Sequence, residues 1–165
     1  MNCIVAVFDN WAIGCNNKLL ARNPIDMAYF KEKTIGKVVI MGRKTLESFP
    51  GGLPLKKRTN IVLTTDPNYK PPGVIVVSSF EELDKELEKY NSDDVFVIGG
   101  ESVYRQLLPK CKKAYVTKVE NVFKADTWFP NLDESEGWEL LSQGEEQTYE
   151  GLKFRFTTYE RNADL

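Results

Sequence analysis

The residue types in this chain limit the acid–base chemistry that it can perform. Its 165 residues include no histidine, which excludes imidazole general bases and the nucleophilic Ser-His-Asp and Cys-His sites. The three cysteines, Cys3, Cys15 and Cys111, are scattered, so without histidine we expect no metal site. Proton transfer would therefore depend on carboxylates, lysines, tyrosines, cysteines or water.

One carboxylate, Asp26, is placed where it could bind or protonate a polar ring. It falls in the first turn of a helix that we predict over 24–34, and helical spacing puts it on one face with Met27, Phe30 and Lys33. There it could hold an amidine-like group by two hydrogen bonds. Desolvation would raise its pKa toward the range useful for proton transfer, while the helix N-terminus would lower it. The alternative is that Asn23 and Asp26 form a capping pair, since acidic residues are common in first turns.

Two segments share a strand–glycine–helix pattern that suits phosphate binding, VVIMGRKT (38–45) and VFVIGGESVY (95–104). In a parallel sheet both turns would lie at the carboxyl ends of their strands, where glycine lets a phosphate approach the backbone. Arg43 and Lys44 add positive charge in the first segment. The alternative is that each glycine only permits a tight turn, and neither GxGxxG nor GxxxxGK[ST] is present.

Two further polar residues lie in or beside predicted strands. Thr117 is in the middle of AYVTKV, and its hydroxyl could orient a carboxylate or bond to the backbone. Arg58 begins RTNIVLT after a basic loop. It could bind a substrate carboxylate, although a solvated strand end is the commoner setting for an arginine.

The elements that must position these residues alternate between strands and helices. We predict strands over 2–7, 37–41, 60–64, 74–77, 95–98 and 113–119, and helices over 24–34, 43–48, 79–89 and 101–108. Two late segments, 138–147 and 152–159, resemble an antiparallel pair. The pattern predicts one α/β domain over residues 1–165 with a largely parallel sheet. The segment 8–23 reads as a long irregular loop of the kind that often covers a binding site.

The composition is that of a globular protein and narrows the expected partners. The formal net charge of -2 argues against nucleic acid or an anionic membrane as the main partner. Met1 leads directly into NCIVAVF without a signal-peptide pattern, and no apolar run could span a bilayer. We therefore expect a cytoplasmic protein that keeps its thiols reduced. Separately, we expect a monomer whose partners are small molecules.

Taken together, the motifs resemble dihydrofolate reductase of the bacterial type. The matching segments run in order through nearly the whole chain: IVAVFDNWAIGCNN (4–17), the PxD helix (24–34), VVIMGRKTLESFP (38–50), LPLKKRTNIVLT (53–64), VFVIGGESVY (95–104), YVTKV (115–119) and ADTWFP (125–130). The resemblance implies a mostly parallel, twisted eight-stranded sheet with an antiparallel C-terminal edge and flanking helices. It also implies hydride transfer from NADPH to C6 of dihydrofolate with protonation at N5, and binding of antifolate-like molecules.

The resemblance also implies a role for each candidate residue. Asp26 would bind the pteridine amino-amide edge and support protonation through water, with Thr117 as its partner, and Arg58 would bind the α-carboxylate of the glutamate tail. The folate site would be lined by Ile4, Met27, Phe30, Lys31, Phe49 and Leu55. The nicotinamide end would meet Ala6, Ala12, Ile13, Gly14, Asn17 and Lys18. The phosphates and adenosine would be held by Gly42, Arg43, Lys44, Thr45, Thr64, Thr65, Gly99, Gly100, Glu101, Ser102, Val103 and Tyr104. Asp126 would support the early loop.

The chain departs from the family pattern at three places. Leu19-Leu20-Ala21 stands where Leu-Pro-Trp usually precedes the PxD helix, so we expect a larger, wetter pocket and slower hydride transfer. Lys56-Lys57 replaces the proline–glycine found before the tail-binding arginine. Ser78 stands where relatives often carry a basic residue that grips the 2′-phosphate, which bears on the preference for NADPH.

Two other functions fit parts of the pattern. A pyrimidine reductase of riboflavin synthesis resembles this fold, but Asp26 in the PxD setting and Arg58 favour folate. A folate- or NADPH-binding paralogue with weakened turnover would agree with Ala21, whereas Asp26, Thr117 and both glycine turns favour an enzyme.

Overall fold

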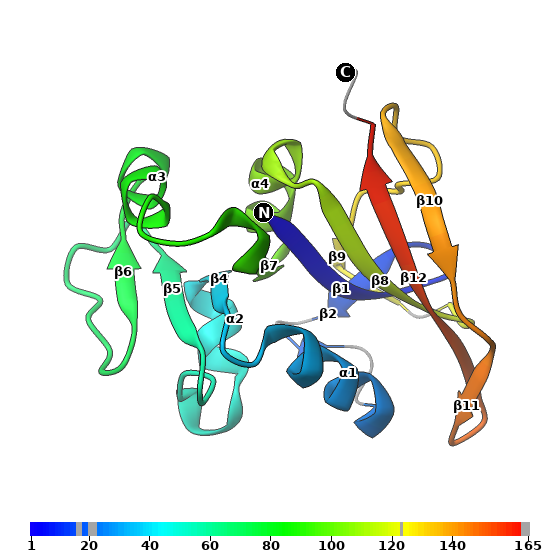
Figure 1. The fold of residues 1–165 in the computed structure, drawn as a ribbon. Coiled ribbons are helices and arrows are strands. Elements are labelled where there is room, and N and C mark those ends of the chain that lie inside the picture. The colour runs from blue at the N-terminus through cyan, green and yellow to red at the C-terminus, as the bar shows by residue number, and fades with distance from the viewer. Residues whose placement is uncertain (16–17, 20–22, 123, 163–165) are drawn as a thin grey trace.

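The computed structural model describes residues 1–15, 18–19, 23–122 and 124–162, which form one main sheet, a small second sheet and flanking helices. The main-sheet strands are β1 (Asn2–Phe8), β4 (Val38–Gly42), β5 (Thr59–Leu63), β6 (Ile75–Val77), β7 (Val95–Gly99), β8 (Lys113–Val119), β10 (Trp138–Gln143), β11 (Gln147–Tyr149) and β12 (Leu152–Arg161). Eight of them follow the order β10-β12-β8-β1-β7-β4-β5-β6, and β11 pairs with β12 (Figure 1).

The direction of the strands confirms the predicted sheet. All neighbours from β8 to β6 are parallel, while β12 runs antiparallel to β8, β10 and β11. The central strands β4 and β7 are built almost wholly of buried, mostly β-branched residues. This composition is expected of parallel strands that are covered on both faces.

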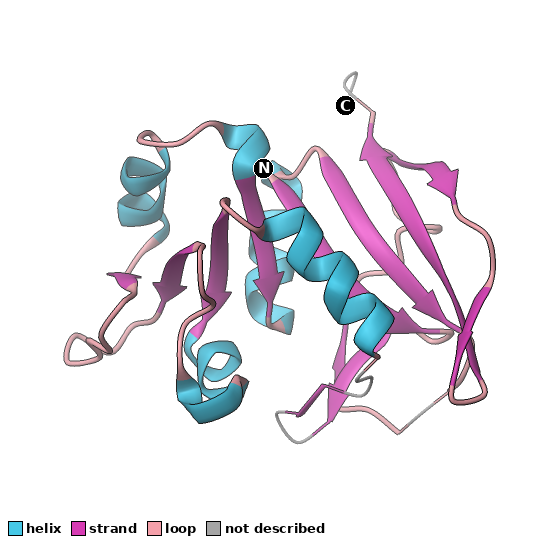
Figure 2. Ribbon diagram, turned by 60° about the horizontal axis from the view of Figure 1, so that its bottom comes forward, coloured by secondary structure: helices cyan, strands magenta, loops and turns pink. Residues whose placement is uncertain are grey.

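Helices cover both faces of the main sheet (Figure 2). They are α1 (Pro24–Thr34), α2 (Arg43–Ser48), α3 (Phe80–Leu87) and α4 (Glu101–Leu107), with single 3₁₀ turns at η1 (Pro50–Gly52), η2 (Ser92–Asp94) and η3 (Leu108–Lys110). Side chains of α1 and α2 pack on one face with Val39 and Met41, and those of α3 and α4 pack on the other with Ile40 and Val97. None of the helices in the described ranges is long and apolar enough to cross a bilayer.

The segment 8–23, predicted as an irregular loop, contains strands in its described part. β2 (Ala12–Cys15) pairs with β3 (Lys18–Leu19) and with β9 (Thr127–Trp128), forming the three-stranded sheet β3-β2-β9. The partner β9 lies more than a hundred residues further along the chain, so a local sequence pattern cannot reveal the pairing. The backbone N–H of Asp126 also donates to the carbonyl of Gly14, which ties the late segment to the early one.

The late antiparallel pair is present, but its first member is interrupted. The predicted strand 138–147 ends at Gln143, where Gly144 donates its N–H to the carbonyl of Phe156, and β11 starts only at Gln147. The second strand extends past its predicted end to Arg161. The alternation of polar and apolar residues did not reveal this break, at which Gly144 is bonded to a residue twelve positions further along the chain.

Candidate active site

Asp26 is hydrogen-bonded across the fold rather than to its own helix. The Thr117 hydroxyl, in the middle of β8, donates to Oδ1 of Asp26 at 2.6 Å, and Thr117 is only 2% exposed. The helix is capped by Asn23, whose side chain accepts from the backbone N–H groups of Ile25 and Asp26. The capping function is therefore carried by Asn23, and the Asp26 carboxylate is bound to β8 instead.

Burial sets the acidity of this carboxylate. It raises the pKa of Asp26 above the ordinary carboxyl value, and the hydrogen bond from Thr117 lowers the pKa by a smaller amount. A carboxyl group in this state can be protonated at a higher pH than a surface aspartate, which is what proton transfer near neutrality requires. The geometry thus supports acid–base work at Asp26.

An apolar cluster forms the surroundings of this helix. Four of the residues predicted to line a ring-binding site belong to it: Ile4, Phe30, Phe49 and Leu55. Ile98 also belongs to the cluster but was missed by the sequence analysis. Ile98 is the only partly exposed residue among Val95–Gly99. The uniformly apolar sequence of this strand predicts burial of every residue and so does not single out Ile98. The predicted contacts Met27 and Lys31 are exposed, Met27 by 62%.

β1 and β7 separate near this cluster. Their ladder pairs Asn2 with Phe96 and Cys3 with Val97, and no later pair forms along these two described strands. Ala6 is the partly exposed residue of β1 and lies opposite Thr117 on β8. The partial exposure of Ala6 and Ile98 shows that solvent reaches the sheet where this ladder has ended.

Tyr104 bridges the two separated strands. Its hydroxyl donates to the carbonyl of Ile4 at 2.7 Å, and a Cβ built on Gly99 would lie 3.7 Å from its ring. Tyr104 therefore contacts β1 with its hydroxyl and the end of β7 with its ring. It joins the predicted ring site to the second glycine turn.

The two glycine turns lie side by side at one edge of the sheet. Met41 pairs with Gly99, Gly42 pairs with Leu63, and Leu63 pairs with Val77. The ends of β7, β4, β5 and β6 therefore follow one another at the carboxyl edge of four adjacent parallel strands, where open α/β sheets bind ligands. This arrangement brings together the predicted phosphate-binding residues Gly42 to Thr45, Thr64, Thr65 and Gly99 to Tyr104.

The turns leave little room for anything larger than glycine. A Cβ on Gly42 would come within 3.3 Å of Val103, and one on Gly99 within 3.3 Å of the Thr45 hydroxyl. Gly99 also has a φ of +136°, which side chains with a Cβ rarely adopt, and the Gly99–Gly100 peptide bond is cis. A bare backbone at this edge fits a pyrophosphate that must approach closely.

Arg43 is not a free cation at this edge. Its Nε donates to Glu47 at 2.7 Å, its Nη1 donates to Asp66 at 2.9 Å, and its guanidinium lies 4.5 Å from the Tyr69 ring centre. Lys44 is exposed. Directly after β6, Ser78 donates both its N–H and its hydroxyl to the carboxylate of Glu82.

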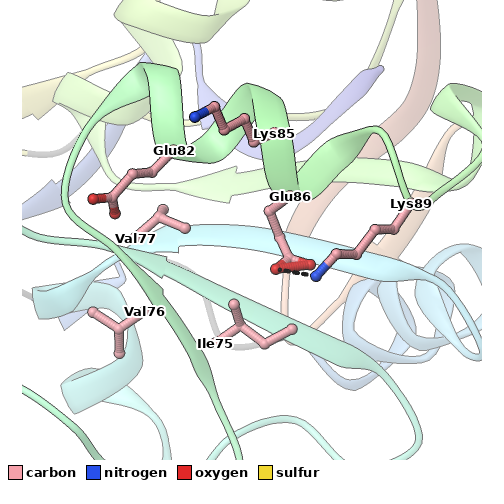
Figure 3. A pocket seen from close by; sticks show the side chains of 7 residues that line it. All are labelled: Ile75, Val76, Val77, Glu82, Lys85, Glu86 and Lys89. Atoms are coloured by element: carbon pink, nitrogen blue, oxygen red, sulfur yellow. Dashed lines mark hydrogen bonds and ion pairs between the residues drawn. The ribbon is translucent and has the colours of Figure 1, made fainter.

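Glu82 also borders a shallow hollow of about 280 Å³ between α3 and β6. Figure 3 shows the side chains of Glu82 and Glu86 from α3 above the strand residues Ile75 and Val77. The lining contains none of the predicted site residues, so the hollow lies outside the candidate site.

Arg58 is held by the loop before β5 and by Asn60, a residue that the sequence analysis did not select. Its Nε donates to the Lys56 carbonyl, its Nη1 donates to the Thr34 hydroxyl, and burial lowers its pKa. Asn60, 3% exposed, accepts from the N–H of Leu55 and donates to the carbonyls of Leu55 and Arg58. Since Asn60 satisfies three backbone groups of the loop, it fixes the position from which Arg58 projects.

The early loop meets the second glycine turn through β9. Ala12, Ile13 and Gly14 are buried, and Ala12 pairs with Trp128, whose N–H donates to Glu101 at 2.5 Å. The backbone of Lys18 pairs with Cys15 in the small sheet. Asn17 and Ala21, both singled out by the sequence, lie outside the described residues.

Known proteins share both the sequence and the fold of this chain. Residues 1–161 match the family model described as dihydrofolate reductase. The dihydrofolate reductase of Bacillus subtilis is 40% identical over 161 residues, which cover 96% of this chain and 92% of that protein. The Haemophilus influenzae enzyme is 42% identical over 137 residues, covering 83% and 82%.

The fold agrees with the same assignment. A solved structure of dihydrofolate reductase from Enterococcus faecalis, complexed with NADP(H) and RAB-propyl, matches with a TM-score of 0.87 and 37% identity, covering 98% of this chain and 95% of that one. Sequence and fold agree over nearly the whole length, and the chain therefore belongs to the dihydrofolate reductase family.

Proposed function

We propose that this chain reduces 7,8-dihydrofolate to 5,6,7,8-tetrahydrofolate with NADPH as the hydride donor, and so supplies one-carbon metabolism and thymidylate synthesis. The observation that carries the proposal is the bond from Thr117 to Asp26, which holds a carboxyl group of raised pKa beside the apolar cluster. The relatives named above are dihydrofolate reductases, and the Enterococcus structure is a complex with NADP(H).

In this proposal Asp26 performs two tasks. Its carboxylate accepts hydrogen bonds from the amino-amide edge of the pteridine, a planar two-donor group that fits a carboxylate. Thr117 keeps the carboxylate in one orientation. The raised pKa lets Asp26 support delivery of a proton to N5 through water, while the bound NADPH would supply the hydride to C6.

The remaining residues position the two reactants. Ile4, Phe30, Phe49 and Leu55 provide apolar contacts for the ring and its aryl extension, with the exposed Met27 and Lys31 at the rim. Arg58 binds the α-carboxylate of the glutamate tail, held by Asn60 and the Thr34 hydroxyl. The nicotinamide lies toward Ala6 and the early loop, and the phosphates lie along the glycine turns.

We further propose an oligomeric state and a location for the protein. It would act as a cytoplasmic monomer whose partners are dihydrofolate, NADPH and antifolate-like small molecules. The net charge of -2 gives no general attraction to nucleic acid. Gel filtration at micromolar concentration tests the monomer, and a dimer peak would contradict it.

The test of the reaction is to mix the protein with NADPH and dihydrofolate and follow the loss of reduced nicotinamide absorbance. We expect turnover, its loss in Asp26→Asn, and its retention in Asp84→Asn, which removes an exposed carboxylate of α3 paired with Lys110. Oxidation only with the aminopyrimidine substrate of riboflavin synthesis would favour that reductase instead. Binding of both ligands without oxidation would favour the non-catalytic paralogue.

A further inference from the structure

The end of the cofactor site near β5 and β6 carries more negative charge than a phosphate-binding surface should. Arg43 lies between two carboxylates, Glu47 at 2.7 Å and Asp66 at 2.9 Å. At the adjoining end of β6, Ser78 binds the carboxylate of Glu82. A ribose 2′-phosphate arriving here would meet the exposed Lys44 and an arginine, Arg43, whose charge two neighbouring acids more than balance.

The hydrogen-bonding groups of Arg43 are also partly used. A guanidinium grips phosphate through either of two forks, the edge formed by Nε and a terminal nitrogen or the edge formed by its two terminal nitrogens. Glu47 occupies Nε and Asp66 occupies Nη1. Each fork therefore has one nitrogen that already serves a carboxylate.

Asp66 is fixed in place rather than loosely placed on the surface. Its Oδ1 accepts from the N–H of Asn68 at 2.9 Å, its own N–H donates to the Thr64 hydroxyl, and its Oδ2 binds Arg43. The Tyr69 ring lies against the same guanidinium. The Asp66 carboxylate is therefore held beside Arg43 by the turn that contains Asn68, where it competes with a phosphate for the guanidinium.

In nucleotide sites, an arginine favours a 2′-phosphate, and a carboxylate favours the free 2′-hydroxyl as its hydrogen-bond acceptor. This chain holds both groups in one ion pair. We propose that Asp66 is a specificity-determining residue that weakens the preference for the 2′-phosphate, so that the enzyme accepts NADH as well as NADPH. The inference rests on the proposed function, because it assumes that a nicotinamide dinucleotide binds along the glycine turns.

The test measures binding separately from turnover. Dissociation constants for NADPH and NADH are obtained from nicotinamide fluorescence, and those for adenosine 2′,5′-bisphosphate and adenosine 5′-monophosphate from calorimetry. For the unchanged protein we expect NADPH to bind less than about tenfold more tightly than NADH. For Asp66→Asn, which keeps an acceptor for Asn68 but removes the charge, we expect a gain of about three- to tenfold in affinity for the 2′-phosphorylated ligands alone.

Two further variants sharpen the result. Glu47→Gln removes the other negative charge beside Arg43 and should shift the ratio of NADPH affinity to NADH affinity in the same direction as Asp66→Asn. Asp84→Asn removes one negative charge on α3 and should leave the ratio unchanged. The inference would be overturned if the ratio of NADPH affinity to NADH affinity stayed the same or fell in Asp66→Asn. It would also be overturned if Asp84→Asn raised this ratio as much as Asp66→Asn does. If the protein oxidises NADPH with dihydrofolate but shows that result, the proposed function stands and only the role of Asp66 fails. Binding of neither dinucleotide would overturn both.

Discussion

The Thr117 hydroxyl and the Asp26 carboxylate are 91 residues apart in the chain and 2.6 Å apart in space. The bond joins the middle of β8 to the first turn of α1, and both partners lie beside the part of β1 that contains Ala6. It therefore determines where a partly buried negative charge is placed relative to the sheet, and the first two predictions concern this pair.

Asp26→Asn is expected to stabilise the fold at neutral pH while it removes activity. Because burial raises the folded-state pKa of Asp26, the ionised carboxylate is less favourable in the folded chain than in the unfolded one. The loss of folding stability caused by this charge begins as pH rises through the ordinary aspartate pKa of 3.8, and it is complete above the raised pKa of the folded state. Thermal melts should show a gain of about 0.5–2 kcal/mol near neutrality, the range of single stabilising substitutions, which disappears in acid. A lower melting temperature at neutral pH would contradict this account.

Thr117→Val is expected to raise the pKa of Asp26 further, because the hydroxyl now lowers that pKa by donating to the carboxylate. Carboxyl ¹³C NMR titration measures the shift directly. The matched control is Thr157→Val, which removes another hydroxyl at 2% exposure, one that donates to the Val116 carbonyl. Both variants should lose about 1–2 kcal/mol of stability, but only Thr117→Val should move the titration midpoint. Equal midpoints in the two variants would refute the positioning role.

Asn60→Ala is expected to raise KM for dihydrofolate while kcat changes little. The substitution leaves three backbone groups of the loop before Arg58 without their partner, at a cost of about 2–3 kcal/mol in stability. A dihydropterin without the glutamate tail serves as the control substrate, since it makes no use of Arg58. If KM rose equally for both substrates, the loop would not be acting through the tail.

Lys57→Gly is expected to stabilise the protein. Lys57 has a φ of +59°, in the left-handed region that costs a residue with a Cβ about 1–2 kcal/mol, and part of this is recovered by glycine. A net gain of about 0.5–1 kcal/mol should appear in urea unfolding. Lys56 has no positive φ, so Lys56→Gly should instead lose stability. Equal changes in the two variants would show that φ at position 57 is not the cause.

Ala21→Trp is expected to speed hydride transfer, as measured in a single turnover. The expectation rests on the resemblance drawn from the sequence, in which Ala21 takes the place of a tryptophan that would wall the pocket near Asp26, and Ala21 lies outside the described residues. Excluding water from the site strengthens its electrostatic interactions. An unchanged single-turnover rate would reject the idea that Ala21 slows the reaction.

Helices and strands were predicted accurately where residues at both of their ends mark the boundaries. The helices 24–34 and 43–48 and the strand 113–119 have their predicted bounds, because proline, glycine and β-branched runs mark their ends. The small sheet was not predicted, since β2 depends on a partner near residue 127. The candidate site likewise contains contacts that a local sequence pattern can indicate and contacts that it cannot. Arg43 was predicted to bind a phosphate, and its ion pair with Glu47 was not predicted, although Glu47 lies four residues on and the spacing favours such a pair. The contact with Asp66 depends on the loop after β5, and no local pattern predicts it.

The short ladder between β1 and β7 has a mechanical consequence. The rungs at Asn2 and Cys3 join the amino-terminal halves of the two strands, and the carbonyl of Ile4, directly after the last rung, accepts from the Tyr104 hydroxyl. Beyond Cys3 no ladder bond holds β1 to β7 in the described strands, so we expect these two strands to move apart more easily there than at the rungs. In the proposed reaction the two reacting rings would meet beside this opening, and a local separation of β1 and β7 would let them approach and part while the paired strands on either side stay in place.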